Sequence, residues 1–277
     1  MRLVNKVALG ILGLATFIAT PSLAADLAVK APAYKAPVLA PAPVQSWTGF
    51  YIGGNIGGVT NTNSGTTNFT DSIIGGAGFP APNRQNASGF LGGGQVGYNW
   101  QFDPHWLIGV EADGDFTNAK YGFCRGTIVA GICGDTGFGT ETLNSKTDWI
   151  TTVRGRFGTV VMDKFLLYVT GGAAWGRVET TATQSCLVGG CGASPLATVG
   201  TSNSSVTRQG WVAGLGAEWN VERNWFVRAE WLHTDLGNIT SSVTTAGFAG
   251  SFQTFTWSRS DRLDQFRVGL DYRFWPG

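Results

Sequence analysis

The sequence predicts an all-β protein: an eight-stranded antiparallel transmembrane β-barrel with up-and-down topology. Three observations lead to this prediction. Charged residues make up only 13% of the 277 residues, whereas a soluble domain usually carries about 25%. Beyond residue 24 no apolar run is long enough for a membrane-spanning helix. Extended segments instead alternate apolar and polar residues, which lets a barrel strand face lipid on one side and the lumen on the other.

Residues 1–24 have the features of a secretory signal peptide. Arg2 and Lys6 precede an apolar run at 7–19, and the small residues Ser22 and Ala24 follow it. The run is too short to span a bilayer, so we predict cleavage after Ala24. A buried amphipathic helix would not explain why the basic start and the small-residue end occur together.

The composition of residues 25–46 predicts a periplasmic tether. Four prolines, at positions 32, 37, 41 and 43, favour extended backbone in an Ala-rich and Pro-rich stretch. The remaining residues, 47–277, are then expected to form one barrel domain in the outer membrane.

Eight segments of the barrel region keep bulky apolar residues on one parity. In the last segment, for example, Phe266 and Val268 flank Arg267. The first segment is rich in glycine, which leaves its facing unassigned. The segments are 50–59, 89–102, 106–116, 149–157, 165–175, 211–219, 225–231 and 266–274.

The connections between these segments alternate in length. Residues 103–105, 161–164 and 220–224 are short, whereas 60–88, 117–148, 176–210 and 232–265 are long and rich in Ser, Thr, Asn and Gly. Small barrels place short turns in the periplasm and long loops outside the cell. Both chain ends are therefore expected on the periplasmic side.

Aromatic residues recur at both ends of the apolar parity. On most segments the two positions are about 20–25 Å apart along the barrel axis, which matches the apolar band of a membrane barrel. A soluble β-sandwich also has alternating strands, but it would bury its aromatic face. The two aromatic belts and the rhythm of loop lengths favour the barrel.

Charged residues on the opposite parity are predicted to form a network in the lumen. An eight-stranded barrel is only wide enough inside for side chains, so buried charges should pair with one another. A gated or very narrow pore, with selectivity set by these charges, remains an alternative. Acid–base catalysis by paired carboxylates is a further alternative that no pocket signal supports. The predicted network is Glu111, Arg154, Arg156, Glu218, Arg228, Glu230, Arg267, Asp271 and Arg273.

No catalytic, cofactor-binding or metal-binding residue is predicted, and the chain is not expected to be an enzyme. Residues 92–97 satisfy a G-x-G-x-x-G pattern, but a dinucleotide site needs this turn to open a helix. Here the pattern lies inside a strand, where we expect the glycines to relieve crowding. His105 falls in a short turn and His233 at the end of a strand, as expected for surface or belt residues.

Four cysteines form two close pairs in the long connections, Cys124 with Cys133 and Cys186 with Cys191. In an oxidising compartment each pair is expected to form a disulfide within its own loop. Zinc binding and pairing between the loops remain open alternatives.

Residues 47–58, WTGFYIGGNIGG, resemble the opening strand of the small outer-membrane proteins of rhizobia and their relatives. This family is called the outer membrane immunogenic proteins or the small porin family. The resemblance implies an OmpA-like eight-stranded barrel whose last strand, ending at Phe274, is recognised by the barrel-insertion machinery. Here Trp275, Pro276 and Gly277 follow that residue. Further matching stretches are GYNWQF (97–102), GVEAD (109–113), YVTGGAA (168–174), RAEW (228–231) and RVGLDYRF (267–274).

The expected function is a structural outer-membrane protein that supports envelope integrity and displays four disulfide-tightened or flexible loops. Its expected partners are outer-membrane lipid and lipopolysaccharide, and the net charge of +1 argues against nucleic acid. The first alternative is a small diffusion channel. The second is a surface adhesin or ligand-binding protein that uses the 60–88 and 176–210 connections. The family resemblance permits haem capture, although no loop has a His or Tyr cluster. Contacts with peptidoglycan or a host surface are not assigned.

Overall fold

The computed structural model describes residues 46–72, 76–77, 81–126, 139–187 and 196–274. All of them fall within one compact unit. The predicted signal peptide (1–24), residues 25–45 of the predicted tether and the 275–277 overhang lie outside the described residues, so they stay predictions. Among the described residues no helix has the length and hydropathy needed to cross a membrane.

The described chain is almost entirely β-strand, with a single short 3-10 helix, η1 (Phe248–Gly250). The strands are β1 (Gly49–Asp71), β2 (Gly76–Ala77), β3 (Ala81–Asp103), β4 (Trp106–Thr117), β5 (Lys120–Gly126), β6 (Gly139–Val161), β7 (Phe165–Cys186), β8 (Thr198–Glu222), β9 (Trp225–Ala246) and β10 (Phe252–Arg273).

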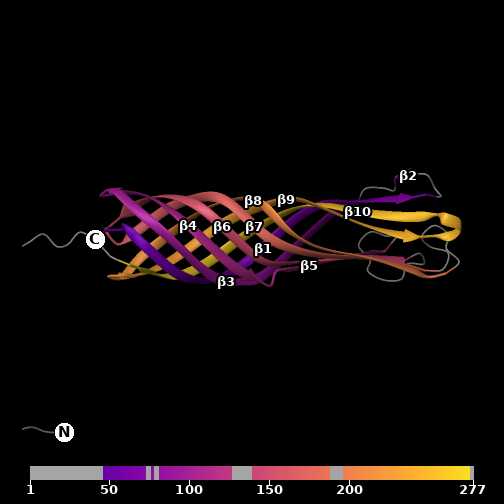
Figure 1. The fold of residues 1–277 in the computed structure, drawn as a ribbon, viewed down its shortest axis with the longest axis horizontal. Coiled ribbons are helices and arrows are strands. Elements are labelled where there is room, and N and C mark those ends of the chain that lie inside the picture. Colours follow the sequence, from indigo (N-terminus) through magenta and orange to yellow (C-terminus); the bar gives the residue numbers. More distant parts are fainter. Residues whose placement is uncertain (1–45, 73–75, 78–80, 127–138, 188–195, 275–277) are drawn as a thin grey trace, which may run out of the picture. The chain divides into compact units, whose positions relative to one another are not determined.

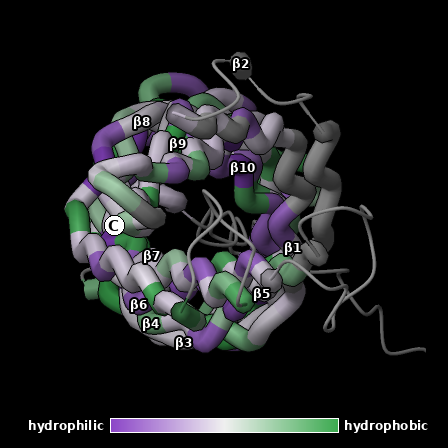
Figure 2. Tube along the Cα trace, turned by 90° about the vertical axis from the view of Figure 1, so that its right-hand side faces the viewer, coloured by the Kyte–Doolittle hydropathy of each residue, from purple (hydrophilic) through white to green (hydrophobic). Residues whose placement is uncertain are grey.

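These strands close into a ring, seen end-on in Figure 2. Sequential strands pair antiparallel, and β10 pairs with β1 to complete the circuit. Both β4 and β5 pair with β6 as successive parts of one wall, whereas β2 is a two-residue strand on β1. The ring therefore has eight strands, and the predicted eight-stranded antiparallel barrel is confirmed.

The three short turns lie together at one end of the barrel (Figure 1). Their positions agree with the predicted short connections between β3 and β4, β6 and β7, and β8 and β9. In the β6–β7 turn, Met162 and Asp163 have φ values of 53° and 58°. Such left-handed backbone at two successive residues is typical of tight hairpin turns.

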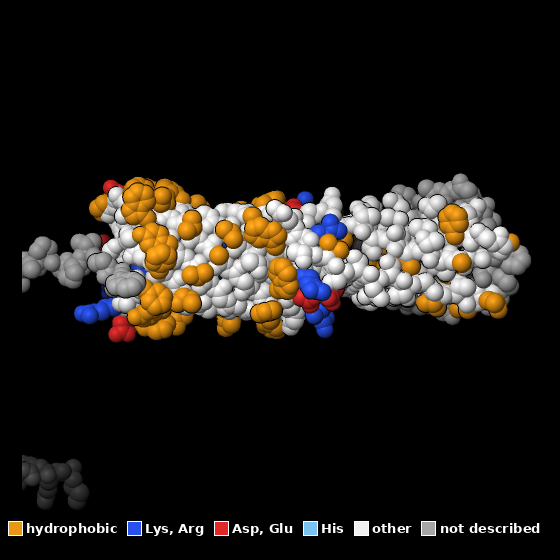
Figure 3. Space-filling view, viewed as in Figure 1, with side chains coloured by type: hydrophobic (Ala, Val, Ile, Leu, Met, Phe, Trp, Pro, Cys, Tyr) orange, Lys and Arg blue, Asp and Glu red, His pale blue; other side chains and the backbone are white. Residues whose placement is uncertain are grey.

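Apolar side chains of the barrel wall face outward, as predicted. Phe90 and Phe116, which lie at the end of the hydrophobic belt farther from the short turns, are 78% and 76% exposed. Figure 3 shows large hydrophobic side chains gathered on one half of the visible face, then a group of charged side chains, and then a surface with few charges and some further hydrophobic side chains at its far end. Further exposed residues of this belt are Ile56, Val96, Trp100, Phe102, Trp106, Val110, Val153, Phe157, Val169, Trp211, Leu215, Trp219, Trp225, Phe266, Val268 and Phe274.

The prediction of four long loops was wrong over much of their length. The ladder of β1 and β3 continues to the pair Thr67 and Ala81, and that of β6 and β7 to Gly139 and Cys186. The β9–β10 ladder reaches Ala246 and Phe252. Strands therefore continue well beyond the hydrophobic belt and form an extension of the barrel.

In this extension the ring divides into two sheets. Pairing of β3 with β4 ends at Leu91 and Thr117, and pairing of β8 with β9 ends at Trp211 and Asp235. Beyond these points β9, β10, β1 and β3 form one sheet, and β5, β6, β7 and β8 form the other (Figure 1).

A small apolar core joins the two sheets of the extension. The first sheet contributes Val243, Phe255 and Trp257, and the second contributes Tyr121, Leu143 and Ala182. All six are buried. Packing of apolar side chains between facing sheets stabilises such an arrangement, so the extension is a packed element and not a set of separate loops.

Candidate functional site: the filled lumen

The interior of the membrane-spanning part holds a network of buried ion pairs. Each of its carboxylates contacts at least one arginine, and all of these side chains are at most 5% exposed. The six carboxylates are Glu111, Asp113, Asp115, Glu218, Glu230 and Asp271, and the four arginines are Arg154, Arg156, Arg228 and Arg267.

Arg154 on β6 contacts three carboxylates. Its guanidinium pairs with Glu111 on β4, with Asp113 Oδ2 at 2.8 Å and with Glu230 Oε1 on β9 at 2.8 Å. Thr152 donates a further hydrogen bond to Asp113 at 2.5 Å. Arg154 and Glu111 are direct cross-strand partners, so the register of two neighbouring strands places this pair together.

Two more arginines link the carboxylates on the turn side of Arg154. Arg228 Nη1 lies 2.6 Å from Glu111 Oε2, and its Nη2 lies 2.9 Å from Asp271 Oδ2. Arg156 Nη2 lies 2.5 Å from Glu218 Oε1. Arg228 and Glu218 are again cross-strand partners, on β9 and β8.

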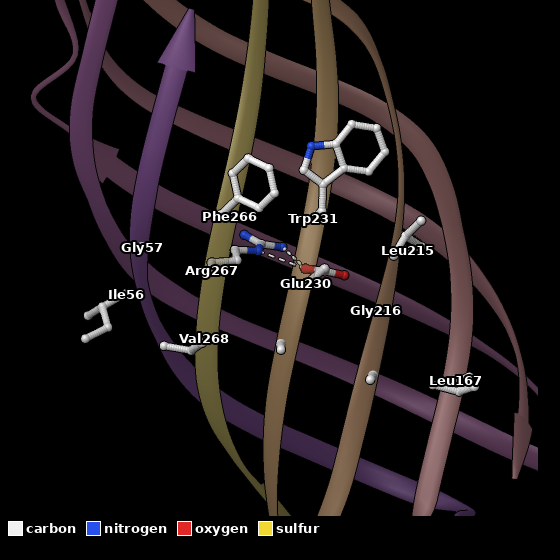
Figure 4. A pocket seen from close by; sticks show the side chains of 12 residues that line it. Ile56, Gly57, Leu167, Leu215, Gly216, Glu230, Trp231, Phe266, Arg267 and Val268 are labelled. Carbon is white, nitrogen blue, oxygen red and sulfur yellow. Dashed lines mark hydrogen bonds and ion pairs between the residues drawn. The ribbon is translucent and has the colours of Figure 1, made fainter. Parts of the chain in front are cut away.

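Arg267 on β10 completes the network on the opposite side. It contacts Asp115 Oδ2 at 2.5 Å, Asp113 Oδ1 at 3.2 Å and Glu230 Oε2 at 2.8 Å. In Figure 4, Arg267 and Glu230 form an ion pair on the lumen side of the wall. Phe266 and Trp231, the residues next to them in sequence, lie on the lipid side. Strand alternation thus produces both the apolar belt and the ionic interior.

Two tyrosines bring two further strands, β1 and β7, into the network. Tyr51 on β1 donates to Glu111 Oε2 at 2.5 Å, and Tyr168 on β7 donates to Glu230 Oε1 at 3.0 Å. Each tyrosine lies directly opposite a glycine, Tyr51 opposite Gly97 and Tyr168 opposite Gly216. A Cβ at either glycine would lie within 2.4 Å of the tyrosine side chain.

The glycines therefore make room for these rings. Gly97 belongs to the stretch with the G-x-G-x-x-G pattern, and that stretch lies within β3. Crowding inside the lumen explains why residue 97 is a glycine, as the sequence analysis predicted.

An apolar layer closes the lumen at the turn end. Trp47 is fully buried, with its ring centroid 5.0 Å from that of Phe226. Its backbone N–H donates to Gln101 Oε1 at 2.7 Å. The layer also contains Leu107, Val160, Leu166 and Tyr168.

Arg273 belongs to this layer and not to the ion-pair network for which it was predicted. Its guanidinium lies over the ring of Phe226 at 3.8 Å and over that of Trp47 at 4.9 Å. It donates to the carbonyl of Ser46 at 3.1 Å. Cation–π contacts of this kind favour a desolvated guanidinium.

A second apolar layer closes the lumen toward the extension. These residues share the inward parity of the charged residues, yet they are aliphatic. The layer consists of Val59, Leu91, Ala119, Ile150, Ala174, Val178, Val212, Leu232, Leu236, Ile239 and Leu263. The ionic network is therefore enclosed between two apolar layers, which the sequence analysis did not predict.

Sequence reasoning also missed several members of the network itself. Asp113 and Asp115 lie on the inward parity of β4 and follow Glu111 at every second residue. That spacing was a sufficient signal to include them. For Gln95, which donates to Asp271 Oδ1 at 2.7 Å, and for Tyr51, no charge marks the role in the sequence.

The two histidines lie apart from the lumen network. His105 is in the β3–β4 turn, as predicted. His233 lies between Trp211 and Trp231, with ring centroids 5.6 and 6.4 Å away, and its Nδ1 is 2.9 Å from Asp264. Among the described residues, His, Cys, Asp and Glu side chains form no group of three suited to hold a metal ion.

The described cysteines, Cys124 and Cys186, are both disulfide-bonded. Cys133 and Cys191 lie outside the described residues. Which cysteine pairs with which therefore stays a prediction.

Asp261 is a buried carboxylate of the extension, beyond the aromatic belt. Asn61 Nδ2 donates to its Oδ1 at 2.9 Å. Burial raises the pKa of Asp261, and the charge of Arg259 offsets this only in part. Since the folded pKa lies above the unfolded one, the folded state gains stability as pH falls through the folded pKa and loses it as pH rises.

We therefore expect Asp261→Asn to stabilise the extension at neutral pH and to reduce its pH dependence. The measurement is urea-induced unfolding of wild type and variant in lipid vesicles, at mildly acidic and at neutral pH. Equal pH dependence in the two proteins would contradict the assignment.

A closed ring with an apolar outer belt and an ionic interior defines the class: this is an outer-membrane β-barrel protein. The chain belongs to the outer membrane protein beta-barrel domain family, whose model matches residues 22–274. Its location in the outer membrane agrees with the names of its relatives.

Three similar proteins illustrate the relationship. The 31 kDa outer-membrane immunogenic protein of Brucella melitensis is 33% identical over 266 residues, covering 94% of this chain and 97% of that protein. The 22 kDa outer membrane protein of Rhizobium leguminosarum bv. viciae is 30% identical over 217 residues, covering 76% and 74%. The crystal structure of Neisserial surface protein A matches with 14% identity and a TM-score of 0.35, covering 82% of this chain and 98% of that one. The resemblance to the outer-membrane immunogenic proteins is thus confirmed.

Proposed function

We propose that this protein is a non-conducting structural barrel that supports the outer membrane and holds a two-sheet extension at the cell surface. The observation that carries the proposal is the filled lumen. Buried ion pairs link strands across the barrel, and an apolar layer lies on each side of them. Hydrated ions would have to cross both apolar layers, which is energetically costly.

This arrangement supports a structural role over a catalytic one. General acid–base chemistry needs a carboxylate that can reach a substrate. Here Glu111, Glu218 and Glu230 are held by arginines and are at most 5% exposed. Their geometry stabilises the barrel by joining strands that are not neighbours.

The test is conductance of the purified, folded protein in a planar lipid bilayer. We expect no steady current above that of the protein-free bilayer. Uniform, long-lived current steps would overturn the proposal and favour the diffusion channel. In that case Arg154→Ala and Arg228→Ala should change the ion selectivity of those steps, because both side chains would line the path.

A second candidate function is binding by the extension. Its support is the β8 segment 201–207, most of whose residues are exposed on both faces. Replacing residues 179–205 of the β7–β8 hairpin with a two-residue turn joins the cross-strand partners Val178 and Val206, removes most of this segment and should keep the barrel folded. Loss of adhesion or ligand uptake in cells with this variant would support binding, and unchanged uptake would exclude this hairpin.

A further inference from the structure

Charged side chains gather in a band on the visible face of the wall, between the hydrophobic belt and the extension (Figure 3). Most of its charges are matched. Arg262 Nε lies 3.1 Å from Asp235 Oδ2, and His233 Nδ1 lies 2.9 Å from Asp264 Oδ1. On the β9–β10 side, Arg262 and Asp235 therefore offset one another, and Asp264 has His233 as a hydrogen-bond partner.

On β5 and β6 the band has an excess of positive charge. Lys120 and Lys146 are direct cross-strand partners on the outer face. Like charges placed directly opposite on a sheet repel each other. Lys146 pairs with Asp148, but no carboxylate of the described residues forms an ion pair with Lys120.

The neighbouring charges do not remove this excess. Arg177 and Glu179 on β7 form a loose pair of 3.8 Å. Together with the two lysines and Asp148 they leave one net positive charge. The hydrogen bond from Lys146 to Asp148 raises the pKa of Lys146, so its ammonium stays charged at neutral pH.

The two lysines border a depression in the outer wall. It has a volume of about 390 Å³, and its other lining residues include Gly122, Asn144, Thr181 and the carboxylate of Glu179. A Cβ at Gly122 would approach Asn144 Oδ1 to 3.0 Å. The absence of a side chain at Gly122 therefore leaves space for the depression. The depression offers two ammonium groups and one amide to a small anionic group, and the Glu179 carboxylate on its border is paired with Arg177.

The level of the site in the membrane identifies that group. Trp149 and Phe116 are cross-strand partners at the outer end of the hydrophobic belt, and aromatic residues mark the membrane interface. Lys146 comes three residues before Trp149, on the side of the extension. The lysines therefore lie at the level of lipid headgroups in the outer leaflet.

We infer that Lys120 and Lys146 bind a phosphate group of lipopolysaccharide. The phosphates of its lipid part lie just outside the acyl region, and an ammonium pair matches such a charge. A bound phosphate would also relieve the repulsion between the lysines. The inference depends on the outer-membrane location and not on whether the lumen conducts.

Binding of fluorescent lipopolysaccharide to the detergent-solubilised, folded protein tests the inference. We expect the double variant Lys120→Ala/Lys146→Ala to raise the Kd about tenfold, since two charge-assisted contacts are lost. Lys164→Ala, in the turn at the opposite end of the barrel, serves as control and should bind like wild type. Folding of each variant is checked by its heat-dependent shift in gel mobility.

Two comparisons use wild-type protein alone and so do not depend on the variants. Dephosphorylated lipopolysaccharide should bind wild type about tenfold more weakly than intact lipopolysaccharide does. Phosphatidylglycerol should compete poorly. Equal binding of the dephosphorylated form, equal competition by phosphatidylglycerol, or wild-type affinity in the folded double variant would each overturn the inference.

Discussion

Replacing Arg154 with alanine is expected to lower the free energy of unfolding by about 3–5 kcal/mol, since it leaves buried carboxylates without their counter-charge. Glu111, Asp113 and Glu230 all contact this guanidinium, and all are buried. Urea-induced unfolding in lipid vesicles, followed by tryptophan fluorescence, measures the loss.

Two further variants make this result specific. Arg154→Lys keeps the positive charge, but a lysine ammonium lacks the planar, forked guanidinium that contacts three carboxylates. We therefore expect this variant to lose an intermediate amount of unfolding free energy. Arg262→Ala removes an arginine whose pair with Asp235 is on the surface, and it should cost at most about 1 kcal/mol. If Arg154→Ala cost no more than Arg262→Ala, the lumen network would not be a major source of stability.

Replacing Trp47 with alanine is the second change with a large expected effect. Removal of a fully buried tryptophan typically costs about 3–5 kcal/mol. Here it would also leave the Arg273 guanidinium without one of its two aromatic contacts. The same urea titration measures the effect.

Trp47→Phe is the matched control, because a smaller aromatic ring can still contact Phe226 and Arg273. It should lose clearly less stability than Trp47→Ala. The alanine variant should still not conduct in a planar bilayer, since the second apolar layer, on the other side of the network, remains. Equal losses in both variants would show that the aromatic contacts are unimportant.

The facing of the membrane-spanning strands could be predicted from the sequence because alternation is a local property. Arg267 lies between Phe266 and Val268, and the pleat of a strand sends such neighbours to opposite sides. The same reasoning placed eight of the nine predicted charged residues in the ion-pair network. The alternation also placed Arg273 on the correct face of its strand. The residues that Arg273 contacts could not be predicted, because they depend on the position of Trp47.

The extension was missed because its outward residues are Ser and Thr, which also characterise loops. In β10, however, Phe255 and Trp257 alternate with Thr254, Thr256 and Ser258. This period of two was a readable sign of a strand with one buried face. What no local pattern could give is the division into two sheets, since it depends on which strands stop pairing.

The apolar layers in the lumen could not be predicted from the alternation of apolar and polar residues either. Leu232 and Leu236 continue the inward parity of Glu230. The alternation tells which side of the wall a residue faces but not what lies at that height inside. Only the packing of all eight strands shows that aliphatic side chains meet there.

Arg267 is on β10, whereas Asp115, which pairs with Arg267, is on β4 in the first half of the chain. A partly assembled sheet that lacks β10 would present Asp115 without its counter-ion, so we expect water to hydrate this carboxylate until the final seam between β10 and β1 closes. Dehydration of the interior and closure of the cylinder are thus one step. We therefore expect the species that precedes the closed barrel to be an open sheet with a hydrated interior.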